Sequence, residues 1–106
     1  MLPRMRARAR ERGFGCDIDA DFLLDLLVKQ NFRCAVTGLE MTMTTGQGKT
    51  PTNVSVDRIN PHLGYTKGNV RLVCTVINSM RGSMSDTELA EWAQHIISGR
   101  QKKKWD

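Results

Sequence analysis

The sequence predicts a small α+β domain, and three observations lead to this fold class. Segments with helical periodicity lie near both ends, two short strand-like segments lie between them, and the 106 residues leave room for one domain. Apolar residues make up 40% and charged residues 25% of the chain, as in soluble globular proteins. No apolar run approaches the roughly 20 residues that cross a bilayer, so we expect a cytoplasmic protein.

The first predicted helix begins after Asp17 or Asp19, either of which can cap its N-terminus, and ends near Gln30. The apolar residues that recur at helical spacing in this segment are Phe22, Leu23, Leu26 and Leu27. A short extended piece is predicted at residues 32–36, before a turn signal. Residues 40–53 are small and polar and predict a surface loop.

A hairpin followed by a helix is predicted in the middle of the chain. Residues 54–59 have the alternating pattern of a strand with one buried face, and residues 70–73 form a second short strand. A helix then runs from near Cys74 to about Met80, with Gly82 as its stop.

The last predicted helix has the clearest start signal, because Ser85 and Glu88 form a capping-box pattern. Its apolar residues at helical spacing are Leu89, Trp92, Ala93, Ile96 and Ile97. Gly99 is expected to end the helix before a run of lysines. We expect Trp92 to lie in the core and His95 to have a structural role.

The net charge of +5 reflects basic residues concentrated at the two ends of the chain. These residues are Arg4, Arg6, Arg8, Arg10 and Arg12 at one end and Arg100, Lys102, Lys103 and Lys104 at the other. We therefore divide the chain into a basic arm (1–15), a domain (16–99) and a basic tail (100–106). The two ends fit contacts with nucleic-acid phosphates, or they are solvated segments that keep the protein soluble. An anionic membrane is a third option, but neither end has the apolar face that such binding usually adds.

Cys16, Cys34 and Cys74 are expected to be buried small apolar residues. Their number is odd and no two are spaced as C-x-x-C, which excludes a four-cysteine zinc site. A mixed site would need His62 or His95, whose spacing from the cysteines matches no usual zinc pattern. We therefore expect no structural zinc.

The middle of the chain also carries an ordered set of polar residues. Residues 55–60 are Ser-Val-Asp-Arg-Ile-Asn, residues 64–74 are Gly-Tyr-Thr-Lys-Gly-Asn-Val-Arg-Leu-Val-Cys, and Asn78 and Arg81 follow. Residues 54–81 resemble the HNH (His-Me finger) endonuclease family, and more closely phage-associated HNH-like proteins, with an arginine in place of the first histidine. The resemblance implies a small ββα-metal core of a two-stranded hairpin and a helix, flanked by N- and C-terminal helices.

The resemblance also implies roles for three residues. Asp57 and Asn78 match the positions that hold a divalent metal, Mg²⁺ or Mn²⁺, whose preferred ligands are oxygens. Asn69 matches the residue whose side chain braces the loop and holds the catalytic group in place. Each position also has an ordinary interpretation: Asp57 in an ion pair or turn, Asn78 as an exposed helical residue, and Asn69 bonding local backbone.

Arg58 stands where the family has the histidine that activates water. Arginine keeps its proton near neutral pH and is a poor base, but its fork suits a phosphate. Three alternatives follow: His62 serves as the base, a metal-bound hydroxide attacks while Arg58 stabilises developing charge, or the site has kept binding and lost hydrolysis. The competing interpretation of His62 is an ordinary exposed loop residue.

The resemblance therefore implies a divalent-metal-dependent endonuclease that cleaves DNA phosphodiester bonds, with a catalytically inactive HNH-like DNA-binding module as the alternative. The expected phosphate contacts, each also open to interpretation as solvated charge, are Lys67, Arg71, Arg81, Arg4, Arg6 and Arg8. RNA stays open as a second partner, and a protein with an acidic surface is a third possibility. A phage-encoded protein of this kind would act in the cytoplasm of a bacterial host.

Overall fold

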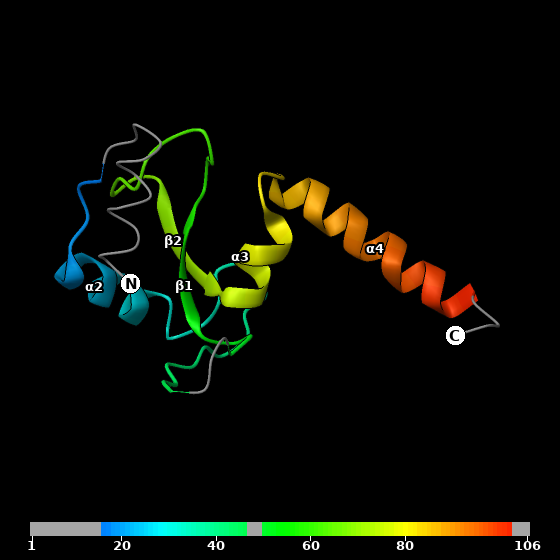
Figure 1. Ribbon diagram of the computed structural model, residues 1–106, viewed down its shortest axis with the longest axis horizontal. Coiled ribbons are helices and arrows are strands. Elements are labelled where there is room, and N and C mark those ends of the chain that lie inside the picture. The colour runs from blue at the N-terminus through cyan, green and yellow to red at the C-terminus, as the bar shows by residue number, and fades with distance from the viewer. Residues whose placement is uncertain (1–15, 47–49, 103–106) are drawn as a thin grey trace.

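The structure is a computed structural model that describes residues 16–46 and 50–102 (Figure 1). Its helices and strands, in chain order, are α2 (Ala20–Lys29), β1 (Val54–Arg58), β2 (Val70–Cys74), α3 (Thr75–Arg81) and α4 (Asp86–Lys102). This confirms the expected α+β fold, with a hairpin and a helix between an N-terminal and a C-terminal helix. Within the described ranges, no helix has both the length and the apolar character needed to cross a membrane.

The two strands pair antiparallel in a register that places Val54 opposite Cys74 and Arg58 opposite Val70. Residues 59–69 join the strands, and α3 begins directly after β2. α3 packs against both strands and runs back along the hairpin, as Figure 1 shows. The last residues of α3 therefore lie beside the end of β1.

α2 begins where the sequence predicts and is tied to the hairpin at its other end. The Asp19 carboxylate accepts a hydrogen bond of 2.8 Å from the Phe22 backbone N–H, which confirms Asp19 as the N-cap. At the other end, the Gln30 amide donates to the Leu72 carbonyl (2.9 Å) and accepts from the Leu72 N–H (3.0 Å). These two bonds are of the kind that a neighbouring strand would make, so they hold α2 against β2.

The core lies between α2, the hairpin and the segment that joins them. Its buried apolar members are Ile18, Leu23, Leu27, Cys34, Met41, Tyr65, Val70, Leu72, Val73 and Cys74. Cys34 and Cys74 are buried as expected, and the Cys74 backbone N–H lies 3.3 Å from the Cys34 sulfur. Cys16 is half-buried and packs against the edge of this core.

Residues 32–36 do not form the expected extended piece. Asn31 and Phe32 have φ values of +54° and +59°, a left-handed conformation that turns the chain immediately after α2. The segment contributes an isolated bridge from Arg33 to Glu40 instead of a strand. The turn depends on the backbone conformation of Asn31 and Phe32, which the pattern of apolar and polar side chains does not predict.

α4 differs from expectation in its length and in its burial. It continues through Gly99 to Lys102, because a helical glycine costs only about 1 kcal/mol and good helix formers follow it. Trp92 is 60% exposed and does not lie in the core. α4 contacts α3 near its first turns and then extends away from the body (Figure 1), so Leu89 is its one buried residue.

Candidate functional site

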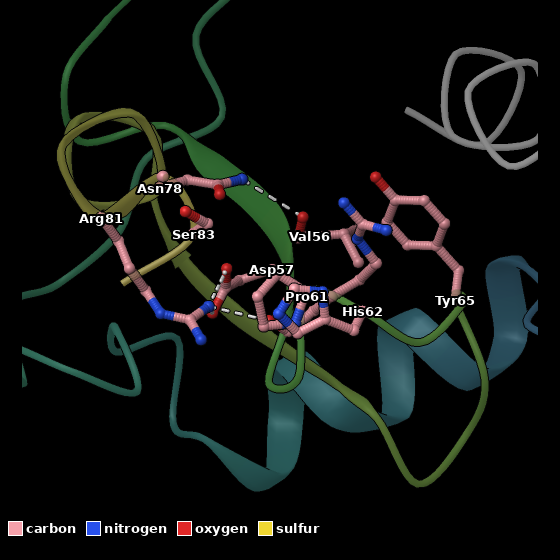
Figure 2. A pocket seen from close by; sticks show the side chains of 10 residues that line it. Val56, Asp57, Pro61, His62, Tyr65, Asn78, Arg81 and Ser83 are labelled. Carbon is pink, nitrogen blue, oxygen red and sulfur yellow. Dashed lines mark hydrogen bonds and ion pairs between the residues drawn. The ribbon is translucent and has the colours of Figure 1, made fainter. Parts of the chain in front are cut away.

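A pocket of about 680 Å³ opens between the end of β1, the loop that follows and the last turn of α3 (Figure 2). Its lining residues are Val56, Asp57, Arg58, Pro61, His62, Tyr65, Asn78, Arg81, Gly82 and Ser83. The fold thus gathers the expected metal pair, Asp57 and Asn78, in one place with Arg58, His62 and Arg81. The residues meet here because α3 runs back along the hairpin from the end of β2, so that its last turn lies beside the end of β1.

Asp57 is a buried carboxylate whose charge is balanced by two guanidinium groups. Its side chain is 4% exposed. Its Oδ1 accepts a hydrogen bond from Arg81 Nη1 (2.8 Å), and its Oδ2 accepts from Arg81 Nη1 (2.9 Å) and Arg71 Nε (2.9 Å). A buried charge is costly unless it is paired, so this arrangement is what allows the carboxylate to sit beneath the pocket.

Arg81 is buried as well, with 3% of its side chain exposed. Besides Asp57, it donates to the carbonyls of Arg58 (2.7 Å) and Ile59 (2.6 Å) and so joins the end of α3 to the end of β1. Its Nε has no hydrogen-bond partner among the described residues and lies 3.6 Å from Asp86 Oδ1. Arg81 was expected to contact phosphate, but its side chain is buried and instead joins α3 to β1.

Arg71 extends the same network to the start of α4. It donates to both oxygens of Asp86, at 2.7 and 2.6 Å, in addition to its bond with Asp57. The hydrogen bond with Asp86 is the main reason that the pKa of Arg71 is raised, and the bond with Arg71 holds the pKa of Asp86 below its ordinary value. Arg71 does not line the pocket. Asp86 is absent from the expected site residues because, in the sequence, it is simply an acidic residue in the first turn of a helix.

Asn69 lies outside the pocket and has the contacts expected of a loop brace. Its Oδ1 accepts from the Asn60 backbone N–H (2.8 Å), and its Nδ2 donates to the carbonyls of Asn60 (3.1 Å) and Gly64 (2.9 Å). The side chain is buried, so these bonds replace the water that would otherwise satisfy the loop backbone. The loop that carries His62 is thereby joined to the residue preceding β2.

Asn78 presents its oxygen on the pocket side. Its Nδ2 donates to Ser55 Oγ (2.7 Å) and to the Val56 carbonyl (3.2 Å), and these bonds orient the amide. Figure 2 shows the side chain above Asp57, with its nitrogen directed at β1. No donor within the described part of the chain bonds its Oδ1, which remains available for a ligand.

Arg58, His62 and Tyr65 form the other side of the pocket. The Arg58 guanidinium lies 5.1 Å from the centre of the Tyr65 ring and donates to the Leu63 carbonyl (3.3 Å). His62 is exposed, and its backbone N–H donates to Asn60 Oδ1 (2.9 Å), which fixes the start of the loop. An exposed imidazole therefore faces the same pocket as the oxygen of Asn78.

The remaining expected phosphate contacts lie away from the pocket or outside the described residues. Lys67 is exposed on the hairpin loop, and its Nζ lies 5.9 Å from the centre of the Phe22 ring. Arg4, Arg6 and Arg8 lie outside the described residues.

The oxygen ligands for a divalent metal are few. The described residues contain no group of three or more His, Cys, Asp or Glu side chains that could hold an ion. Asp57 accepts three hydrogen bonds out of about four that a carboxylate can accept, which leaves one position on Oδ1, and Asn78 Oδ1 adds a second oxygen. Mg²⁺ is often held by one or two protein oxygens together with water and substrate phosphate, so these residues fit such an ion. The guanidinium groups beside Asp57 oppose its charge, so binding would strengthen once a phosphate is present.

No family model matches this sequence, and a search of the curated proteins finds no match. Among solved structures, the chain is similar to the rare-cutting HNH restriction endonuclease PacI, for which a mechanism of DNA perturbation has been described. The TM-score is 0.64 at 21% sequence identity, and the match covers 92% of this chain and 75% of that chain. This similarity shows that the chain has an HNH-like fold.

Proposed function

We propose that the protein is a divalent-metal-dependent endonuclease that cleaves phosphodiester bonds of DNA. The observation that carries the proposal is the pocket at the end of β1, where Asp57, Arg58, His62 and Asn78 face one space. The HNH-like fold, shared with a protein named as a restriction endonuclease, supports it. The net charge of +5 is in keeping with a polyanionic substrate.

In this proposal, Asp57 and Asn78 hold the metal through their oxygens. When bound, the ion would polarise the scissile phosphate and stabilise the leaving oxygen. Arg58 lines the same pocket, and its fork can contact two phosphate oxygens. Lys67 and the arm residues Arg4, Arg6 and Arg8 are proposed as contacts with neighbouring phosphates.

His62 is proposed as the general base. It takes a proton from water as the water oxygen bonds to phosphorus and the bond to the leaving sugar oxygen breaks. That sugar oxygen then takes a proton from solvent. Asn69 acts indirectly, because its hydrogen bonds hold the loop that carries His62.

The test is nicking of a supercoiled plasmid by the pure protein in Mg²⁺ or Mn²⁺. Because a general base contributes about 100-fold or more, His62→Ala should lower the rate by at least that factor. His95→Ala is the matched control, since His95 is exposed on α4 and does not line the pocket, and it should leave the rate unchanged. Nicking that persists in excess chelator, or that is equal in His62→Ala, would rule out the proposed mechanism.

The metal ligands are tested by two further variants. Asn78→Ala removes one oxygen at a half-buried position and should abolish metal-dependent nicking while the fold is retained. Asp57→Ala should do the same, with its circular dichroism checked because Asp57 is buried between two guanidinium groups. A folded Asp57→Ala protein with full activity would remove Asp57 from the metal site.

Two observations favour a second candidate, a DNA-binding module that does not cleave. The charge of Asp57 is already balanced by Arg71 and Arg81, and Arg58 occupies the position of the family's base. Such a module binds DNA with an affinity that falls steeply as salt rises and shows no nicking in any metal. Metal-dependent nicking by the purified wild-type protein, absent from the His62→Ala variant, would exclude this second candidate.

A further inference from the structure

Two cysteines that the proposed nuclease site does not use lie against each other in the core. Cys34 and Cys74 are both free and are 3% and 1% exposed. The Cys34 sulfur accepts a hydrogen bond from the Cys74 backbone N–H (3.3 Å), and the two side chains also hydrogen-bond to each other. The residues are 40 positions apart in the sequence, so the fold brings the two sulfur atoms together. Neither residue lines the pocket at the end of β1.

The turn formed by residues 34–38 surrounds the Cys34 sulfur with hydrogen-bond donors. The Gly38 N–H donates to the Cys34 carbonyl (2.9 Å), and the φ of +73° at Gly38 lets the chain reverse there. The Thr37 hydroxyl donates to the sulfur, as do the backbone N–H groups of Val36 and Thr37. Donors of this kind stabilise a thiolate more than a thiol.

The two thiols differ in acidity as a result. Burial raises the pKa of Cys34, but hydrogen bonds from the Thr37 side chain and from the backbone at Cys74, Thr37 and Val36 outweigh burial and lower this pKa below its ordinary value. Burial also raises the pKa of Cys74, and the nearby charge of Cys34 raises it further. Cys34 is therefore the residue of the pair that forms a thiolate, with Cys74 beside it as a protonated thiol.

A groove between α3 and α4 leads toward this pair. It holds about 180 Å³, and its lining includes Thr37 and Ile77. Because the Thr37 side chain also bonds the Cys34 sulfur, the groove reaches a side chain that contacts the thiolate. A reactive cysteine needs access as well as a thiolate, and a small oxidant such as hydrogen peroxide can approach along this groove.

We propose that Cys34 and Cys74 form a redox-modification site, which a peroxide oxidises to an intramolecular disulfide. A disulfide needs its sulfur atoms about 2.05 Å apart, and two cysteines already in hydrogen-bond contact reach this separation through changes in their side-chain torsions. The bond joins the turn after α2 to the last residue of β2. This inference does not depend on the proposed nuclease activity.

The oxidation proceeds in two steps. The Cys34 thiolate attacks one oxygen of hydrogen peroxide, the O–O bond breaks, and the second oxygen leaves as hydroxide, which takes a proton to become water. Cys34 is then a sulfenic acid. The Cys74 sulfur bonds to the Cys34 sulfur, the S–O bond breaks, and the hydroxyl leaves with the Cys74 proton as a second water. The two thiols are oxidised, and one peroxide is reduced to two waters.

The test counts thiols in the full chain before and after treatment with a small molar excess of hydrogen peroxide. The protein is then unfolded in iodoacetamide, and its intact mass is measured. Reduced protein should carry a label on each of its three cysteines, whereas oxidised protein should carry one, on Cys16. Peptide mapping should find Cys34 linked to Cys74. Three labels after oxidation, or a link that includes Cys16, would overturn the proposal.

Cys16→Ser is the matched control, because it removes the cysteine at the edge of the core and leaves the pair intact. This variant should form the same link as wild type, and Cys34→Ser should not. The oxidised wild type should also unfold at a higher urea concentration than the reduced protein, and dithiothreitol should reverse the shift, since a cross-link restricts the unfolded chain. Failure of Cys16→Ser to form the link would mean that Cys16 takes part, contrary to the proposal.

The role of Thr37 is tested by the rate of oxidation. Thr37→Val removes the hydroxyl that bonds the Cys34 sulfur and should slow disulfide formation by a factor between about 2 and about 10, because a rise of one pKa unit lowers the thiolate fraction up to 10-fold. Thr37→Ser keeps the hydroxyl, including its bond from the Leu39 N–H, and should react like wild type. Equal rates in the two variants would contradict activation of Cys34 by Thr37.

Discussion

The ββα core, residues 54–81, and α4 differ in how their polar and apolar side chains are satisfied. In the core, Asp57 and Arg81 are buried and joined to each other and to the backbone at the end of β1. In α4, the charged residues and most of the apolar ones are exposed. The core is thus held by polar contacts between distant segments, whereas α4, among the described helices and strands, packs against α3 near its first turns.

This difference separates the places where a substitution should damage the fold from those where it should not. Removing a partner from the buried network leaves an uncompensated charge, whereas truncating an exposed residue of α4 removes little contact within one chain. Each prediction below compares the two regions by the free energy of unfolding.

The largest effect is expected for Arg81→Ala. This change leaves Asp57 buried with one remaining ion-pair partner, and breaking a buried pair typically costs about 3–5 kcal/mol. Ile96→Ala, at an exposed position of α4, should change the free energy of unfolding by about 0.5 kcal/mol or less. Urea denaturation of both variants measures the contrast. Equal losses would mean that α4 is as integral to the monomer as the core.

A smaller effect is expected for Asn69→Ala. The substitution leaves the Asn60 N–H and the Gly64 carbonyl without their partner, which costs about 1–3 kcal/mol when such groups stay buried. The loss should be confined to the hairpin loop, so amide hydrogen exchange should speed up over residues 59–69 and stay unchanged in α4. Faster exchange spread evenly over both regions would show that Asn69 supports more than its loop.

Local signals in the sequence predicted much of this fold. The Asp19 cap, the hairpin strands and the end of α3 before Gly82 each depend on neighbouring residues, and the structure confirms them. The burial of the Arg81 side chain could not be predicted from the sequence. It depends on a contact with Asp57 that forms because α3 packs back along the hairpin. The exposure of Trp92 is similar: a helical pattern identifies an apolar face but not whether another segment covers it.

Within the site, the resemblance brought together residues that the structure also places around one pocket, namely Asp57, Arg58, His62 and Asn78. It did not predict the link from Arg71 to Asp86, because that pair joins a strand to a helix outside the motif. The spacing of residues in a motif indicates which side chains of one element, or of adjacent elements, lie close together. Ion pairs between elements depend on packing that the motif does not encode.

The smallest effect is expected where the two regions meet, at Asp86→Asn. Asp86 starts α4 and bonds both terminal nitrogens of Arg71, but its side chain is 52% exposed, so solvent screening limits the loss to about 1 kcal/mol or less. The bond with Arg71 holds the pKa of Asp86 below its ordinary value of 3.8. A carboxyl whose pKa is lowered on folding contributes fully above that ordinary value, and the contribution is lost as the pH falls through the lowered pKa.

The difference in stability between wild type and Asp86→Asn should therefore be constant near neutral pH and should shrink toward zero below the ordinary pKa of 3.8. Urea denaturation at neutral pH and at several acidic values measures this change. Helix content should stay the same, because Asn at this position preserves the backbone of α4. A difference that persists unchanged in acid would mean that Asp86 acts through its shape or its hydrogen-bond geometry, and that the junction between the core and α4 does not depend on charge.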